Sequence, residues 1–132
     1  ALADADARLR RAGVTCARRG LPGPGSADVV LADAPCSALG PLRRSPDLRF
    51  TLTPEQLDAF PARQRALLAQ GAELARPGGR LVYATCTVLT AENDEVARTT
   101  ALPVVEQRTL RPDVEGCDGF FVSVRATGRL GC

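Results

Sequence analysis

The chain has 132 residues, of which 45% are hydrophobic and 24% are charged, and its formal net charge is +2. This balance is typical of one globular domain and excludes a disordered chain, because the apolar content is high and the net charge is small. The sequence contains no histidine, and all 17 of its basic residues are arginines. Histidine-dependent hydrolase centres, histidine-ligated zinc, Walker-type phosphate-binding lysines and Schiff-base lysines are therefore excluded.

The cysteine pattern bears on metal binding and on redox compartment. No two of the five cysteines are spaced as CxxC, so a zinc ribbon is not expected and no metal site is predicted. An odd number of cysteines without a visible signal peptide predicts reduced thiols and a cytoplasmic protein. No run of about 18 apolar residues is present, so no membrane-spanning helix is predicted.

The first predicted elements are short. Residues 4–12 are polar and predict the end of a helix that stops at Gly13. Residues 14–17 favour a short strand, and the glycines and prolines of residues 20–25 indicate a connecting loop. Residues 28–33 form a continuous apolar run between two aspartates, which is typical of a buried strand in a parallel sheet.

The middle of the chain predicts a loop followed by helical structure. Residues 34–52 contain three prolines and are expected to be irregular. Thr53 is a suitable N-cap, with proline at the next position and glutamine three residues on. Pro61 is expected to break this helix or to begin a second one, and residues 62–75 carry an apolar stripe at helical spacing.

The last third predicts three strands and one helix. Residues 77–79, Pro-Gly-Gly, stop the helix and turn the chain into a buried strand over 80–85. Thr90 can cap a short helix with acidic residues in its first turn. Residues 102–109 and 119–125 favour two further strands. This order predicts an α/β fold that ends in an antiparallel hairpin.

Reactive side chains follow two of the predicted strands. Asp33 and Cys36 come after the first buried strand, and Cys86 comes directly after the second. One crossover joins these strands, so they are predicted to be neighbours whose carboxyl ends share one rim, where ligands bind in such sheets. The alternative is that each cysteine is only a small buried hydrophobe. Without histidine, Cys86 would need activation by other means, such as the helix that begins soon after it.

Arginines gather in the loop that follows the first buried strand. Arg43, Arg44 and Arg49 form a local basic patch close to the predicted rim. Two interpretations are open: a solvated loop, or contacts with the phosphates of a nucleic acid.

Several short motifs together carry a resemblance to one family. They are Asp-Ala-Pro-Cys-Ser at 33–37, Arg-Arg-Ser-Pro at 43–46, Gln64, Pro-Gly-Gly at 77–79, Leu-Val-Tyr-Ala-Thr-Cys at 81–86, Glu92-Asn93 and Asp-Gly-Phe-Phe at 118–121. In this order they resemble the catalytic domain of the RsmB/NOP2/Sun family of RNA cytosine-C5 methyltransferases, over residues 5–127. The combination of one proline–cysteine and one threonine–cysteine is the most specific part of the resemblance.

The resemblance implies a Rossmann-like class I methyltransferase fold, S-adenosylmethionine as cofactor, and RNA, expected to be ribosomal, as substrate. It implies that the Cys86 thiolate adds to carbon 6 of cytosine and that Cys36 assists release of the methylated RNA. Asp33 is implied to bind the cofactor and to recognise the base, and Pro35 to line the cofactor site. Arg43 and Arg44 are the candidate RNA contacts.

The family's glycine-rich cofactor loop and the acidic residue of its second strand have no counterpart in this sequence. Residues 1–132 are therefore expected to form a single partial domain, truncated at its N-terminus, which lacks the first strands, is monomeric and is inactive in isolation. One rival interpretation is a degenerate, non-catalytic RNA-binding module, because residues 17–20 lack an acid that the family has there. Another is a thiol–redox protein, which predicts a readily formed Cys36–Cys86 disulfide.

Overall fold

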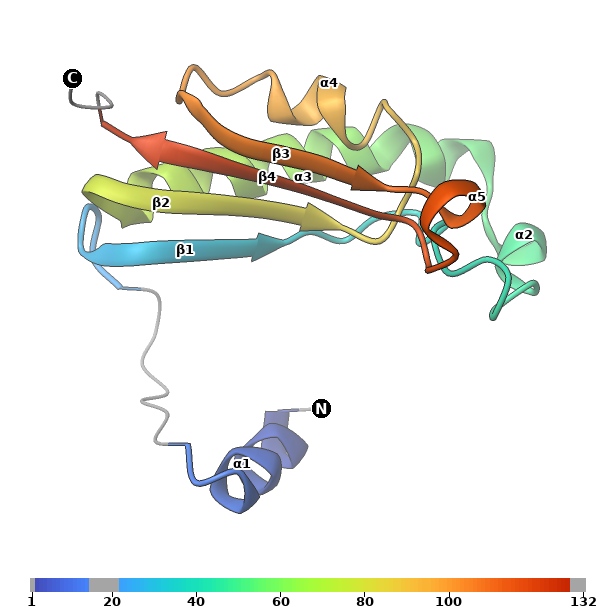
Figure 1. Ribbon diagram of the computed structural model, residues 1–132, viewed down its shortest axis with the longest axis horizontal. Coiled ribbons are helices and arrows are strands. Elements are labelled where there is room, and N and C mark those ends of the chain that lie inside the picture. The colour runs from blue at the N-terminus through green and yellow to red at the C-terminus, as the bar shows by residue number, and fades with distance from the viewer. Residues whose placement is uncertain (1, 15–21, 129–132) are drawn as a thin grey trace.

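A four-stranded mixed sheet forms the centre of the molecule. The computed structural model describes residues 2–14 and 22–128. The strands β1 (Ala27–Asp33), β2 (Ala75–Thr85), β3 (Val104–Leu110) and β4 (Phe120–Thr127) lie in the order β1-β2-β4-β3 (Figure 1). β1 runs parallel to β2, and β4 runs antiparallel to both β2 and β3. The predicted α/β fold with a terminal antiparallel hairpin is confirmed.

Helices cover one face of this sheet. The long helix α3 (Pro54–Leu74) packs on β1 and β2 and also contacts α4 (Asp94–Ala97) (Figure 1). Leu68 of α3 is buried together with Leu81 and Tyr83 of β2 and Phe121 of β4. On the other face, Val29 and Leu31 of β1 are 62% and 67% exposed, so the core lies between the sheet and α3.

The helix start predicted at Thr53 is confirmed, but the break predicted at Pro61 is wrong. The Thr53 hydroxyl accepts from the Gln56 amide at 3.3 Å, and the Gln56 side chain accepts from the Thr53 amide at 3.0 Å. α3 then continues through Pro61 to Leu74. An interior proline costs a helix about 3 kcal/mol, because it removes one hydrogen bond and crowds the preceding turn. The capping box and the burial of Leu68 hold the helix on both sides, and together they outweigh this local penalty.

The glycine turn after α3 lies inside β2. Ala75 already pairs with Ala27 of β1, and the next residue paired with β1 is Arg80, opposite Val29, so β2 bulges away from β1 between them. On the other side of β2, Gly79 already pairs with Thr127 of β4. Gly78 has φ +78°, and a Cβ on Gly79 would lie 2.7 Å from the carbonyl oxygen of Asp28. The helix does stop before this motif, as expected, but the strand begins before the turn rather than after it.

Some other boundaries differ from the predictions. The predicted N-terminal helix is α1 (Leu2–Arg11), whereas the strand expected at 14–17 lies almost wholly outside the described residues. Two four-residue helices, α2 (Leu48–Thr51) and α5 (Pro112–Glu115), occur in segments with no predicted helix. The helix expected from Thr90 begins instead at Asp94, so Glu92 precedes it. No described helix is long and apolar enough to cross a bilayer.

Candidate active site

The two predicted cysteines meet at the carboxyl ends of β1 and β2. Asp33 pairs with Ala84 in the parallel register, and the Ala34 amide donates to the Ala84 carbonyl at 2.9 Å, which extends the pairing beyond β1. Parallel neighbours end at the same edge of a sheet, so Cys36 and Cys86 approach each other there. Their Sγ atoms are 3.4 Å apart, and both residues are half-buried free thiols.

The environment of Cys36 keeps its thiol protonated. Burial raises the pKa of Cys36 from 9.0 to about 12, and the hydrogen bond with Cys86 acts in the same direction. A hydrogen bond from the backbone of Ala38 opposes this effect. Because the pKa of Cys36 lies well above 7, its thiol holds a proton at neutral pH and can donate it to the Cys86 sulfur.

Four buried polar residues form a hydrogen-bonded cluster: Ser37, Gln64, Thr87 and Glu92. Ser37 directly follows Cys36 in the chain, and Thr87 directly follows Cys86. The carboxylate of Glu92 accepts from the Ser37 amide at 3.0 Å and from the Gln64 side-chain amide at 2.8 Å, both on Oε2. Its other oxygen accepts from the Thr87 hydroxyl at 3.3 Å. The Ser37 and Thr87 hydroxyls are 2.8 Å apart. Each cysteine is therefore followed by a residue that belongs to this cluster.

The backbone of the loop that carries Glu92 is fixed against β2. The Tyr83 hydroxyl donates to the Glu92 carbonyl oxygen at 2.6 Å. The Thr85 hydroxyl donates to Oδ1 of Asn93 at 2.5 Å, and Nδ2 of Asn93 donates to the Thr87 carbonyl at 3.0 Å. Burial raises the pKa of Tyr83, so its hydroxyl remains a donor. Three buried side chains thus hold the loop between Thr87 and Asn93 in one position.

Asp33 and Pro35 lie at the same rim but do not join this cluster. Both are exposed, whereas the alternate positions Ala32 and Ala34 are buried, as the alternation of an extended chain requires. Among the described residues, no side-chain hydrogen bond or ion pair involves Asp33. The exposed carboxylate is therefore available to a ligand at the end of β1.

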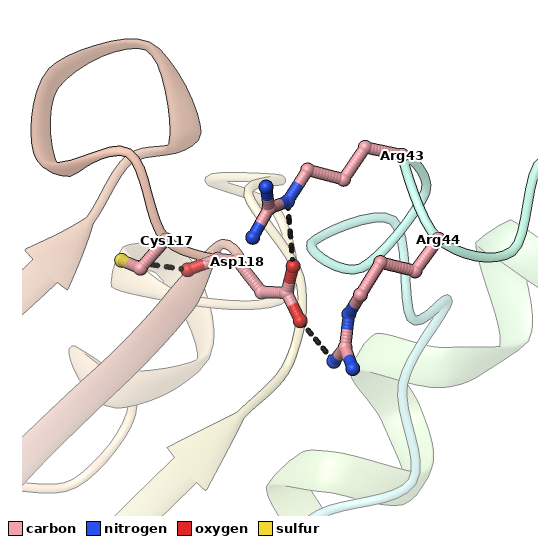
Figure 2. Close-up of polar contacts among 4 residues, drawn as sticks. All are labelled: Arg43, Arg44, Cys117 and Asp118. Carbon is pink, nitrogen blue, oxygen red and sulfur yellow. Dashed lines mark hydrogen bonds and ion pairs between the residues drawn. The ribbon is translucent and has the colours of Figure 1, made fainter.

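The arginine patch is tied to the loop that precedes β4 (Figure 2). Nε of Arg43 donates to one carboxylate oxygen of Asp118 at 3.0 Å, and Arg44 forms an ion pair with the other oxygen. The guanidiniums of Arg44 and Arg43 hold the pKa of Asp118 below its usual value. The side chain of Asp118 is 8% exposed, against 57% for Arg43 and 67% for Arg44. Two cations therefore share one buried carboxylate and keep most of their surface accessible to solvent.

Gly40 joins three loops at this rim. Its amide donates to the Cys86 carbonyl at 3.0 Å, and its carbonyl accepts from the Gly119 amide at 3.2 Å. A Cβ at this position would lie 2.0 Å from the Gly119 oxygen and 2.8 Å from the Cys86 oxygen. Only glycine fits there. The sequence does not indicate that glycine is required at this position, because the two backbone segments that contact it are distant along the chain.

The polar cluster was not predicted as a unit, although the sequence holds a partial signal. Gln64, Leu68 and Gly71 are buried on α3 at positions i, i+4 and i+7, so the spacing places the glutamine on the helix's buried stripe. Glu92 was expected in the first turn of a helix, where an acid favours the positive end of the dipole. It lies instead in the preceding loop and is 1% exposed, where it accepts hydrogen bonds from α3 and from the loops that follow β1 and β2.

Comparison with known proteins gives consistent matches. The family described as 16S rRNA methyltransferase RsmB/F matches residues 17–103. A probable ribosomal RNA small subunit methyltransferase B of Bacillus subtilis is 45% identical over 69 residues, covering 52% of this chain and 15% of the relative. Ribosomal RNA small subunit methyltransferase B of Vibrio vulnificus is 39% identical over 109 residues, covering 74% of this chain and 25% of the relative. The chain thus spans a quarter or less of these two relatives.

A solved structure supports the fold independently of close sequence similarity. NSun6 from Pyrococcus horikoshii superposes with a TM-score of 0.78 at 23% identity, over 97% of this chain and 39% of that one. At this identity the likeness concerns the fold, and it confirms the Rossmann-like methyltransferase architecture that the motifs imply. With the family match over two thirds of its length, the chain belongs to the 16S rRNA methyltransferase RsmB/F family.

Proposed function

We propose that the chain carries the two-cysteine site of an enzyme that methylates carbon 5 of cytosine in ribosomal RNA. The observation that carries this proposal is the convergence of two thiols, 3.4 Å apart, at the carboxyl ends of adjacent parallel strands. The relatives are named for ribosomal RNA methylation, which supports RNA as the substrate and argues against a thiol–redox protein.

Cys86 is the proposed nucleophile. Its sulfur adds to carbon 6 of the cytosine, so that a C–S bond forms and an electron pair becomes available at carbon 5. S-adenosylmethionine, when bound, supplies the methyl group that carbon 5 takes up. The carbon 5 proton then leaves to a base, its electron pair restores the double bond, and the C–S bond breaks to release Cys86 as a thiolate. Cys86 reacts as its thiolate after the thiol proton has passed to solvent, a step that needs no histidine relay in a chain that contains no histidine.

Cys36 is the proposed release residue. Its raised pKa keeps the Sγ–H bond intact at neutral pH, and its sulfur is 3.4 Å from that of Cys86. A hydrogen bond from the Cys36 thiol stabilises the negative charge that develops on Cys86 as the C–S bond breaks. The proton-holding role of Cys36 is therefore supported by its burial and by its position beside Cys86.

Asp33 and Pro35 fit one part of a cofactor and base site. An exposed carboxylate at the end of a parallel strand can accept hydrogen bonds from the cofactor's amino or hydroxyl groups, or from the exocyclic amino group of cytosine. Pro35 offers an exposed apolar surface beside it. One carboxylate cannot enclose the cofactor, so we infer that the chain is a partial domain that contributes one side of the pocket.

The direct test identifies the product. The complete gene product, incubated with ribosomal RNA and S-adenosylmethionine, is expected to form 5-methylcytidine, detected by mass spectrometry after digestion of the RNA to nucleosides. Methylation at another atom or base would contradict the proposed chemistry. RNA binding without any methylation would instead support the rival interpretation, a non-catalytic RNA-binding module.

Arg43 and Arg44 are the proposed phosphate contacts, and their removal is expected to weaken RNA binding. Their side chains remain more than half exposed while Asp118 holds them in place. Each lost phosphate contact lowers the slope of log K against log salt by about 0.7 to 0.9, so the double substitution to Ala should lower it by about 1 to 2. The slope is measured by fluorescence anisotropy at a series of salt concentrations.

The matched control for this pair is Arg76→Ala. Arg76 also pairs with an aspartate, Asp28, but it lies at the opposite end of β2. The control should leave the salt slope unchanged. An unchanged slope in the Arg43/Arg44 double variant would place RNA away from this patch.

A further inference from the structure

We propose that Glu92 is a positioning residue that sets the separation of the Cys36 and Cys86 sulfur atoms. The inference rests on the proposed two-cysteine function and assigns a role to a residue that does not itself contact the reacting atoms. Three features of the site support this role: the hydrogen bonds that Glu92 makes, the fixed position of its backbone, and the orientation of Gln64.

The first observation is that one carboxylate bonds to the residue after each cysteine. Glu92 accepts from the Ser37 amide at 3.0 Å and from the Thr87 hydroxyl at 3.3 Å. Ser37 belongs to the loop after β1 and Thr87 to the loop after β2, so the carboxylate links the two loops within one residue of each thiol. The 2.8 Å contact between the Ser37 and Thr87 hydroxyls closes this link.

The directions of these hydrogen bonds suit a carboxylate. The Thr87 hydroxyl accepts from the Leu89 amide at 3.3 Å and has a single proton, which it donates to Glu92. Ser37 then donates its own hydroxyl proton to Thr87. Glu92 receives only neutral donors, and no ion pair to it occurs among the described residues. A buried carboxylate is costly unless such donors satisfy it, so separation of the two loops would leave the charge uncompensated.

The second observation is that the carboxylate is carried on a fixed backbone. Tyr83 donates to the Glu92 carbonyl, and Asn93 is bonded on both sides of its amide to the end of β2. Glu92 therefore transmits the position of β2 to the loop that holds Cys36. A flexible loop with the same carboxylate could bond to Ser37 without fixing the distance between the sulfurs.

The third observation concerns the orientation of Gln64. Its Nε2 donates both to the Pro35 carbonyl at 3.0 Å and to Glu92 at 2.8 Å, while its buried Oε1 has no partner within the described part of the chain. The opposite orientation would set the Gln64 oxygen against two acceptors, so the observed one follows from the chemistry of its neighbours. Gln64 thus holds the residue before Cys36, and Glu92 the residue after it, at the expense of one unsatisfied oxygen.

The test measures the separation of the thiols without RNA or cofactor. The complete gene product is equilibrated with reduced and oxidised glutathione. Oxidised glutathione takes two electrons from Cys36 and Cys86, which lose two protons and form one S–S bond, and two molecules of reduced glutathione result. After an acid quench and alkylation, mass spectrometry measures the fraction of protein in which the Cys36 and Cys86 peptides are linked. This fraction gives the equilibrium constant for disulfide formation, which reports the effective concentration of one thiol at the other.

Glu92→Ala is expected to lower this equilibrium constant about tenfold, because freeing the loops by a fraction of an ångström lowers the effective concentration of the pair. Glu92→Gln is expected to stay within about twofold, since its carbonyl still accepts from Ser37 and Gln64. Glu95→Ala, at an exposed position of the same segment, is the matched control and should leave the constant unchanged. Rescue by glutamine distinguishes positioning from a general loss of stability.

A folded Glu92→Ala protein with an unchanged constant would overturn the proposal. If that protein does not fold, Thr87→Val decides, since it removes the hydroxyl that donates to Glu92 while keeping the side-chain volume, and an unchanged constant there also overturns the proposal. The proposed function fails separately. Methyl transfer that persists in Cys86→Ala would refute the covalent chemistry, whereas the thiol equilibrium does not depend on methyl transfer.

Discussion

Replacing Cys86 by Ala is expected to abolish methyl transfer to RNA, by roughly four orders of magnitude or more in kcat. The reason is that carbon 5 of cytosine is a poor nucleophile until a group adds to carbon 6. Among the described residues, Cys86 is the thiol at the end of β2 that the resemblance assigns to this addition. The measurement is transfer of a labelled methyl group from S-adenosylmethionine to ribosomal RNA by the complete gene product.

Two controls make this result specific. Cys117→Ala removes another half-buried thiol, whose described side-chain contact is with the carbonyl oxygen of Asp118, and it should retain activity. Binding of RNA should also persist in Cys86→Ala, because the substitution removes one sulfur atom and no charge contact. Appreciable turnover in the Cys86 variant would show that the C–S adduct is not on the reaction path.

Replacing Cys36 by Ala is expected to trap the RNA on the protein. Without the proton-holding thiol 3.4 Å from Cys86, the departing thiolate loses its hydrogen-bond donor and the C–S bond breaks more slowly. The adduct should therefore accumulate and appear as a band of lower mobility on a denaturing gel. Digestion of the RNA should remove the shift.

The Cys36→Ala/Cys86→Ala double variant is the matched control for the adduct. It should give no shifted band, since the proposed bond to RNA runs through Cys86. A shifted band in the double variant would identify another residue as the nucleophile. If Cys36→Ala forms no adduct and turns over at the normal rate, the release role is wrong and the 3.4 Å contact serves only packing.

The polar cluster relates these two predictions to the fold. Cys36 lies in the loop after β1, and burial in this loop raises the pKa of its thiol. The next residue of the same loop, Ser37, donates a hydrogen bond to the carboxylate of Glu92. The hydrogen bond to Glu92 therefore helps to hold the loop so that the protonated Cys36 thiol stays beside Cys86. Gly40, in the same loop, contributes because it has no side chain and lets the backbones of Cys86 and Gly119 approach it closely.

Local patterns in the sequence were sufficient to predict most of the helices and strands. The apolar run at 28–33 and the segment 80–85 both lie within the observed strands. The prediction that 28–33 is buried is wrong, however, because Val29 and Leu31 lie on the face of β1 that none of the described residues covers. Pro61 shows where local reasoning fails. A proline penalty can be read from the sequence, but the cap at Thr53 and the packing of Leu68 that outweigh it act over the whole helix.

By itself, the sequence determined the α/β order, the strand ends at which Asp33, Cys36 and Cys86 lie, and, through its motifs, the family. The tertiary structure alone decided which polar groups meet at those ends. Glu92 bonds to Ser37 across 55 residues of sequence, and Arg43 to Asp118 across 75. Propensity and periodicity report on neighbours within a few positions along the chain, whereas these contacts arise only when packing of the sheet and α3 brings distant loops together.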